Sequence, residues 1–146
     1  MKTIVVSKEI AAPVANVFQT ISDIRNFSEV LPHITGYEFL SETKHGIGTR
    51  FVETRMMKNN EHKTELEVTE FEENSHVRMV ADSNDTIWDT TFKTSETDGV
   101  TTLTLSMDAY SHRWACRIVN FLFRGMIAKS VNTDMQIVKR HLENQA

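Results

Sequence analysis

The fold of this chain is decided by residues 48–110, which read GTRFVETRMMKNNEHKTELEVTEFEENSHVRMVADSNDTIWDTTFKTSETDGVTTLTLSMDAY. Runs of β-branched and aromatic residues here predict strands, and the short groups of Gly, Asn, Asp and Ser between them predict turns. With the run before them, they predict strands near residues 34–42, 48–58, 62–72, 76–82, 86–96 and 100–110. Connectors this short join antiparallel neighbours, because parallel strands need a crossover of about a dozen residues or more. The stretch therefore predicts an antiparallel meander.

A strand and two short helices are predicted before the meander. The strand covers Thr3 to Ile10, where β-branched residues predominate. Pro13 then suits the first turn of a helix, since its missing N–H has no partner there. A second helix follows Asp23, a good N-cap residue, and ends before Pro32.

The residues after the meander predict one long helix. From Ser111, a suitable N-cap, to Asn144 the sequence has no proline and a single glycine, Gly125. An apolar stripe recurs along it at helical period: Val119, Leu122, Phe123, Met126, Ile127, Val131, Met135, Val138 and Leu142. This stripe and one face of the sheet are the only large apolar faces available, so they must pack together.

This order of elements predicts an α+β helix-grip fold. A seven-stranded, curved antiparallel sheet wraps around the long C-terminal helix, with two short helices between the first and second strands. We expect residues 1–146 to form one domain, because this length is typical of one. A twisted sheet cannot follow a straight helix along its whole length. The gap between them is the natural place for a ligand.

Composition and charge limit the partners. The chain has 16 Lys and Arg against 20 Asp and Glu, for a formal net charge of −4, which gives no general attraction for nucleic acid. The single cysteine excludes an internal disulfide. The first residues lack the apolar centre of a signal peptide, and no apolar run could span a bilayer. We expect a cytoplasmic protein without integral membrane association.

Several short segments are similar, in order and spacing, to those of a known superfamily. They are SKEIAAPV (residues 7–14), Val17-Phe18, Ile21-Ser22-Asp23, Phe27, Leu31-Pro32, GIGTRF (residues 46–51), VTEF (residues 68–71), Val138-Lys139 and Leu142-Glu143. Over essentially its whole length the chain resembles the START-like (SRPBCC, Bet v 1-type) superfamily, particularly its bacterial polyketide cyclase/dehydrase-like members. The resemblance implies the helix-grip fold and a hydrophobic cavity. It selects no single function, because the superfamily includes lipid carriers, aromatic cyclases, and coenzyme-Q-binding and ribosome-associated proteins.

The strand near residues 48–58 can face the cavity in two ways. One face carries Phe51, Glu53, Arg55 and Met57, and the other carries Arg50, Val52, Thr54 and Met56. If the first face points inward, Glu53 and Arg55 stand inside an apolar pocket, where the carboxyl group could act as an acid or base or bind a polar group of a ligand. We favour the second arrangement, in which both charges are solvated.

Other residues are candidates for the cavity wall. They share strand or helix faces and are mostly apolar or aromatic: Tyr37, Phe39, Phe51, Trp88, Thr90, Met107, Leu122, Phe123, Met126 and Ile127. The Tyr37 hydroxyl and the Trp88 indole N–H could orient a ligand. An ordinary packed core explains the same pattern equally well.

The leading hypothesis is a protein that binds, and in one version transports, a small hydrophobic, aromatic or lipid-like ligand. The enzyme hypothesis is a cyclase or dehydratase that uses Glu53, Tyr37 and Asp89 for acid/base chemistry. A coenzyme-Q-binding or ribosome-association role is a further alternative. We expect no metal or other cofactor, because the six histidines show no metal-ligand spacing.

Two smaller features remain open. His112 and Cys116 are four residues apart and could form a thiolate nucleophile, although a half-buried cysteine beside an exposed histidine is the simpler interpretation. The segment from Trp114 to Ile127 is apolar nearly all round, so Ile118 and Phe121 would face outward. Such a surface suits a homodimer contact, the cavity mouth or a macromolecular partner better than a membrane.

Overall fold

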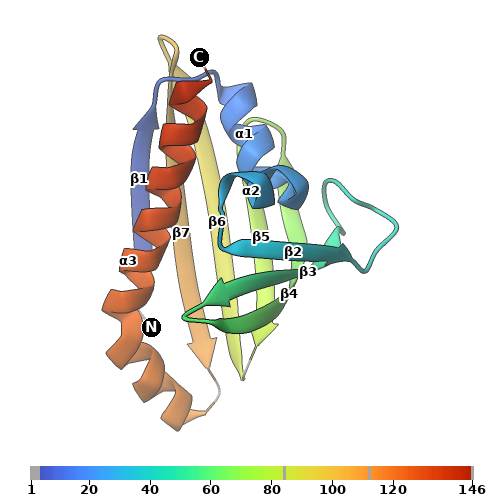
Figure 1. Ribbon diagram of the computed structural model, residues 1–146, viewed down its shortest axis with the longest axis vertical. Coiled ribbons are helices and arrows are strands. Elements are labelled where there is room, and N and C mark those ends of the chain that lie inside the picture. Colours follow the sequence, from blue (N-terminus) through green and yellow to red (C-terminus); the bar gives the residue numbers. More distant parts are fainter. Residues whose placement is uncertain (1–3, 84, 112, 146) are drawn as a thin grey trace.

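The structure is a computed structural model that describes residues 4–83, 85–111 and 113–145, without the side chains of residues 115, 116 and 119–121. Its elements are β1 (Ile4–Ile10), α1 (Val14–Ser22), α2 (Ile24–Val30), β2 (Ile34–Phe39), β3 (Arg50–Met57), β4 (Asn60–Glu72), β5 (His76–Ser83), β6 (Thr86–Thr97), β7 (Val100–Ser111) and α3 (Trp114–Asn144). Figure 1 shows the sheet behind α3, with α1 and α2 beside the C-terminal end of that helix. The helix-grip architecture is confirmed.

The seven strands form one antiparallel sheet in the order β1-β7-β6-β5-β4-β3-β2. Strands β2 to β7 follow one another in the sheet as they do along the chain, which confirms the meander. The first strand closes the order by pairing with β7, Ile4 opposite Met107 and Ile10 opposite Thr101. The predicted first residue of this strand, Thr3, lies outside the described residues.

The hairpins explain why turn residues mark the strand ends so clearly. Lys58 and Asn59 connect β3 to β4 with φ angles of 50° and 65°. Positive φ at both central positions matches the right-handed twist of the two strands, and Asn tolerates it well. The turn lies one residue earlier than the predicted Asn59-Asn60, because Asn60 already pairs with Met57.

The two short helices form as the sequence predicts. Pro13 is in extended geometry immediately before α1. Asp23 caps α2, since its Oδ1 accepts a hydrogen bond of 3.0 Å from the backbone N–H of Arg25. The helix ends at Val30, and Leu31 is extended before Pro32. Both helices pack against each other and bring buried residues against the sheet.

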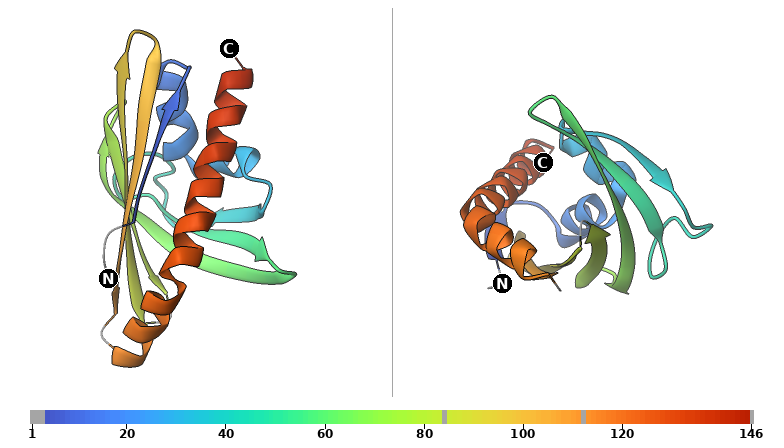
Figure 2. Two further views of the ribbon diagram at one scale, coloured as in Figure 1. Left: turned by 90° about the vertical axis from the view of Figure 1, so that its left-hand side faces the viewer. Right: turned by 90° about the horizontal axis from the view of Figure 1, so that it is seen from below.

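Helix α3 begins later than predicted and behaves differently along its length. Ser111 is not its N-cap, because β7 continues through Ser111, which pairs with Thr86. The helix packs along β1, with further contacts to β7, α1 and α2 (Figure 2). Its C-terminal half buries the predicted apolar stripe: Val131, Met135, Val138 and Leu142.

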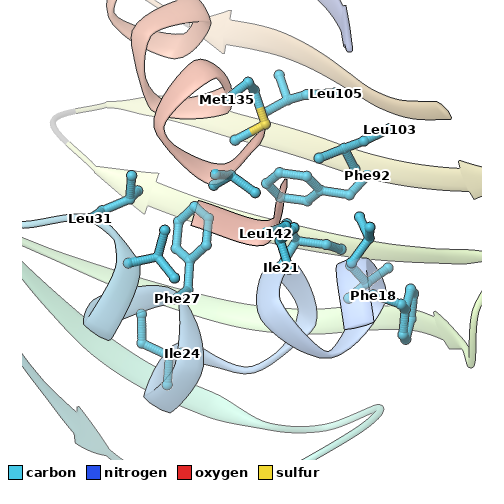
Figure 3. Packing of buried hydrophobic residues seen from close by; sticks show 14 of the residues in the cluster. Phe18, Ile21, Ile24, Phe27, Leu31, Phe92, Leu103, Leu105, Met135 and Leu142 are labelled. Atoms are coloured by element: carbon cyan, nitrogen blue, oxygen red, sulfur yellow. The ribbon is translucent and has the colours of Figure 1, made fainter. Parts of the chain in front are cut away.

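The hydrophobic core gathers where the C-terminal half of α3 meets the sheet and the two short helices. Figure 3 shows Phe27 of α2 and Phe92 of β6 next to Met135 and Leu142 of α3. The rings of Phe27 and Phe92 pack edge to face with their centroids 6.3 Å apart. Near the other end of α3 several large apolar side chains are exposed: Trp114, Ile118, Leu122, Phe123 and Met126. Among the described side chains of α3, those of the C-terminal half are therefore the tightly packed ones.

Candidate functional site

A cavity of about 710 Å³ lies between α3, the two short helices and the concave face of the sheet. This volume is within the range of small-molecule sites. Most of its wall is apolar: Ile21, Ile24, Phe27, Phe51, Met57, Leu66, Met79, Ala81, Trp88, Phe92, Leu105, Met107, Met126, Ile127, Val131 and Met135. Several of these residues also belong to the core. These shared residues pack in the core on one side and line the cavity on the other.

Strand β3 turns its charged face inward. Phe51 and Glu53 are buried, and both line the cavity together with Arg55 and Met57. The favoured prediction, with Arg50, Val52, Thr54 and Met56 inward, is wrong. The reason is a partner that local alternation does not reveal: Arg55 and Glu53 meet an acidic residue of α3 inside the cavity wall.

That residue is Asp134, and with Glu53, Arg55 and His33 it forms what we call the charged cluster. Arg55 donates through Nε to Glu53 Oε1 at 2.5 Å and through Nη1 to Asp134 Oδ2 at 2.9 Å. Nε2 of His33, in the segment between α2 and β2, lies 3.0 Å from Asp134 Oδ1 and 3.2 Å from Arg55 Nη1. Only 9% of Glu53 and 7% of Asp134 are exposed. The cluster places charged groups in a mostly apolar wall.

Arg55 remains a cation in this setting. Burial acts to lower its pKa, but the charges and hydrogen bonds of Glu53 and Asp134 outweigh burial, so the pKa of Arg55 is raised. Two carboxylates and one guanidinium give the cluster a charge of −1 when His33 is neutral. The guanidinium lies between the two carboxylates, donates a hydrogen bond to each of them, and so connects β3 to α3.

A second group of polar residues lines the cavity near the β3–β4 and β5–β6 turns. They are Lys58, Asn60, His62, Thr64 and Ser83, joined from α3 by Ser130. Lys58, Asn60 and His62 are exposed. A ligand held in the cavity would thus meet an apolar middle, the charged cluster on one side and a hydrated, weakly basic rim.

The structure brings most of the predicted cavity residues together. Those that line the cavity are Phe51, Glu53, Trp88, Thr90, Met107, Met126 and Ile127. Tyr37, Phe39, Leu122 and Phe123 are not among the described residues that line it. The Tyr37 side chain is 41% exposed and packs edge to face on Phe39, whereas Leu122 is 70% exposed.

Asp89 lies on the opposite face of the sheet. Its neighbour Thr90 lines the cavity, and successive residues of a strand point to opposite sides. Both Asp89 oxygens accept from Arg78 of β5, at 2.9 and 2.7 Å. This two-bond contact joins β5 and β6 on the outer surface and engages the Asp89 carboxylate away from the cavity.

The sequence interpretation missed Asp134 and His33. A signal for Asp134 was available, because it lies three residues after Val131 and four before Val138, on the apolar stripe of the helix. A carboxylate on such a stripe needs a buried partner. No comparable pattern marks His33, which follows Pro32 in a short connection.

The remaining candidates fall on residues or side chains that the structure does not describe. His112 and the Cys116 side chain lie outside the described residues, as does the side chain of Phe121. Within the described ranges, no three His, Cys, Asp or Glu residues are grouped as metal ligands. In the same ranges, no helix combines the length and apolar character needed to cross a membrane.

Comparison with known proteins agrees with this architecture. No curated protein matches the sequence significantly. The fold is similar to the crystal structure of Ara h 8.0201, with a TM-score of 0.75, 11% identity and 97% of each chain covered. It is also similar to a START superfamily protein from Mycobacterium smegmatis, with a TM-score of 0.68, 10% identity and 99% of each chain covered.

A third similar structure is that of a protein from a biosynthetic pathway. The di-domain ARO/CYC BexL from the BE-7585A pathway gives a TM-score of 0.73 and 14% identity, over 97% of this chain and 50% of its own. These identities show a shared fold only. The family model described as polyketide cyclase / dehydrase and lipid transport matches residues 1–145. With the helix-grip fold and its cavity, this match shows that the chain belongs to the polyketide cyclase / dehydrase and lipid transport family.

Proposed function

We propose that this protein binds a small hydrophobic ligand in the cavity between α3 and the sheet and carries it. The observation that supports this most directly is a volume of about 710 Å³ with a mostly apolar wall beside a well-packed core. An apolar cavity of this size is a place where a ligand loses contact with water. Each Å² of apolar surface buried there contributes about 25 cal/mol to binding.

The polar residues of the wall would orient the ligand. Apolar contacts depend little on direction, whereas hydrogen bonds fix one end of a molecule. The charged cluster offers such bonds beside the C-terminal half of α3, and the rim near Lys58 offers them at the strand ends. The family description, which includes lipid transport, supports a ligand of this kind.

Native mass spectrometry of freshly purified protein tests the proposal. We expect a co-purified molecule that is released by denaturation and is soluble in organic solvent. Ligand-stripped protein should take up the neutral dye N-phenyl-1-naphthylamine with one saturable site, and added lipophiles should displace it. Dye uptake that is neither saturable nor competed would contradict a binding cavity.

One observation favours a second function, a cyclase or dehydratase acting on a polyketide-like substrate. Glu53 is buried and lines the cavity, where a carboxylate could move a proton to or from a bound substrate. Tyr37 and Asp89 lie away from the cavity, so this function would depend on Glu53 with Asp134 beside it. Glu53→Gln separates the two proposals: it should abolish turnover of a substrate that still binds, whereas a carrier loses no activity beyond altered affinity.

A further inference from the structure

The charged cluster restricts which polar group a ligand can present to it. This inference rests on the proposed binding function and concerns the chemistry of the ligand. Glu53 and Asp134 share one guanidinium, that of Arg55, so a negative charge remains when His33 is neutral. Because the carboxylates are buried, water screens that charge poorly. A second anion brought against the cluster would be repelled.

The cluster also has unused hydrogen-bonding capacity. Arg55 uses Nε and Nη1, Glu53 uses Oε1, and both oxygens of Asp134 have partners. Among the described residues, Glu53 Oε2 and Arg55 Nη2 make no hydrogen bond. Neither atom is one of the fully buried polar atoms that lack a partner. Both therefore remain accessible. Glu53 Oε2 can accept a hydrogen bond and Arg55 Nη2 can donate one, and the two side chains are already hydrogen-bonded to each other.

A hydroxyl group complements both atoms, since it can donate to Glu53 Oε2 and accept from Arg55 Nη2. A carboxylate has no hydrogen to donate and adds to the negative charge. An ammonium group can donate to Glu53 but cannot accept from Arg55. We propose that the cavity selects an uncharged alcohol or phenol, with its hydroxyl against Glu53 and Arg55, over the carboxylic acid of the same skeleton.

The basic rim gives a carboxylic acid a second place to bind. The experiment must therefore separate binding at the rim from binding at the charged cluster. Lys58 and His62 are exposed and line the cavity near the β3–β4 turn. An acid could leave its carboxylate there with its chain inside. Lys58→Met should weaken that mode, and so it should not reduce the preference for decanol over decanoate.

The test measures displacement of N-phenyl-1-naphthylamine from the stripped protein at pH 8 by 1-decanol, decanoate and decylamine. We expect decanol to bind at least about tenfold more tightly than decanoate, a ratio typical of one unfavourable partly buried charge contact. Glu53→Gln should reduce this ratio to about threefold or less, because the cluster then has no excess charge. Asp134→Asn should do the same and replaces Glu53→Gln if that variant does not fold.

Lys63→Met is the matched control outside the cavity, because Lys63 is exposed and is not among the described residues that line it. It should leave both decanol affinity and the decanol preference unchanged. Equal or tighter binding of decanoate by the unmodified protein would overturn the inference, as would a ratio that neither cluster variant changes. Tighter binding of decylamine than of decanol would show a cation site instead. If the dye binds saturably, these outcomes leave the proposed function intact; if no probe binds, the proposed function fails and the inference with it.

Discussion

Arg55 of β3 donates a hydrogen bond of 2.9 Å to Asp134 of α3 and thereby joins the helix to the far side of the sheet. The helix packs along β1, at one edge of the sheet, whereas β3 is next to the opposite edge. Figure 2 shows α3 on one side and strands β3 and β4 on the other, and the cavity lies between them. The hydrogen bond between Arg55 and Asp134 connects these two sides of the molecule within the wall of the cavity.

Replacing Arg55 should destabilise the protein strongly. Arg55→Met leaves Glu53 and Asp134 buried without a countercharge, and breaking a buried ion pair in this way costs about 3–5 kcal/mol. Urea unfolding followed by circular dichroism measures this as a lower free energy of unfolding. The triple variant Arg55→Met, Glu53→Gln, Asp134→Asn should recover part of the loss, because no buried charge remains.

Arg50→Met is the matched control on the same strand. Arg50 points outward and pairs with Glu65 across β4, with about half of each side chain exposed. Exposed ion pairs contribute about 0–1 kcal/mol. Similar losses for the two arginine variants would contradict the special role of the charged cluster.

Filling the cavity should separate ligand binding from stability. Ala81 of β5 is buried and lines the cavity, so Ala81→Phe places a ring in space that a ligand would use. We expect the affinity for the neutral dye to fall about tenfold or more while the urea midpoint changes little, since the ring enters existing space. Thr91→Phe, on the outer face of the neighbouring strand, should leave dye affinity unchanged. Unaltered binding by Ala81→Phe would place the ligand elsewhere.

Asp89→Asn should affect stability but not the site. Its carboxylate holds Arg78 on the outer face through two hydrogen bonds. Their loss should cost about 0.5–1 kcal/mol, as for other partly exposed pairs. Dye affinity and any turnover should equal those of the unmodified protein, and a specific loss of turnover would return Asp89 to the catalytic candidates.

Asp23 should make the protein more sensitive to acid. Burial acts to raise the pKa of Asp23, but hydrogen bonds from the side chain and backbone of Arg25, with its charge, outweigh burial and lower it. The unfolded chain, with a pKa near 3.9, therefore takes up the proton first as the pH falls. The stabilisation is present above about pH 4 and is lost as the pH falls through the lower folded value.

Asp23→Asn tests this sign, because the amide can still cap α2. Its deficit in free energy of unfolding should be constant from pH 6 to about pH 5 and should shrink towards pH 3. Asp23→Ala also removes the cap and should lose about 1 kcal/mol more at every pH. A deficit of Asp23→Asn that grows on acidification would contradict the lowered pKa.

The fold could be predicted because its determinants are local. Residues such as Asn59 and Asp98 mark hairpin turns, and short turns leave antiparallel neighbours as the only arrangement. The resemblance to a known superfamily added the overall architecture. Boundaries shifted by up to three residues. Strand β2 ends at Phe39 rather than near residue 42, and Ser111 stays in β7 through its pairing with Thr86.

The site could be predicted only in part, because its determinants are distant in sequence. Each face of β3 carries two apolar residues, so alternation alone could not choose between them. The choice is made by Arg55 and Asp134, which are 79 positions apart. Trp88, Thr90 and Met107, which line the cavity, could be predicted because alternate residues of a strand share one face. The exposure of Leu122 and Phe123 was not predicted, because the apolar stripe of α3 continues through them past the part of the helix that is buried.

The pairing of β1 with β7 has a consequence for how the chain reaches this state. The meander can assemble from hairpins as synthesis proceeds, but Ile4 can find Met107 only after nearly all other strands have left the ribosome. Closing so long a loop costs entropy that local contacts do not repay. The N-terminal strand should therefore join last, together with the helix that packs on it. We expect the apolar lining of the cavity to be exposed to water until then, which makes this the stage at which the newly made chain is most prone to aggregate.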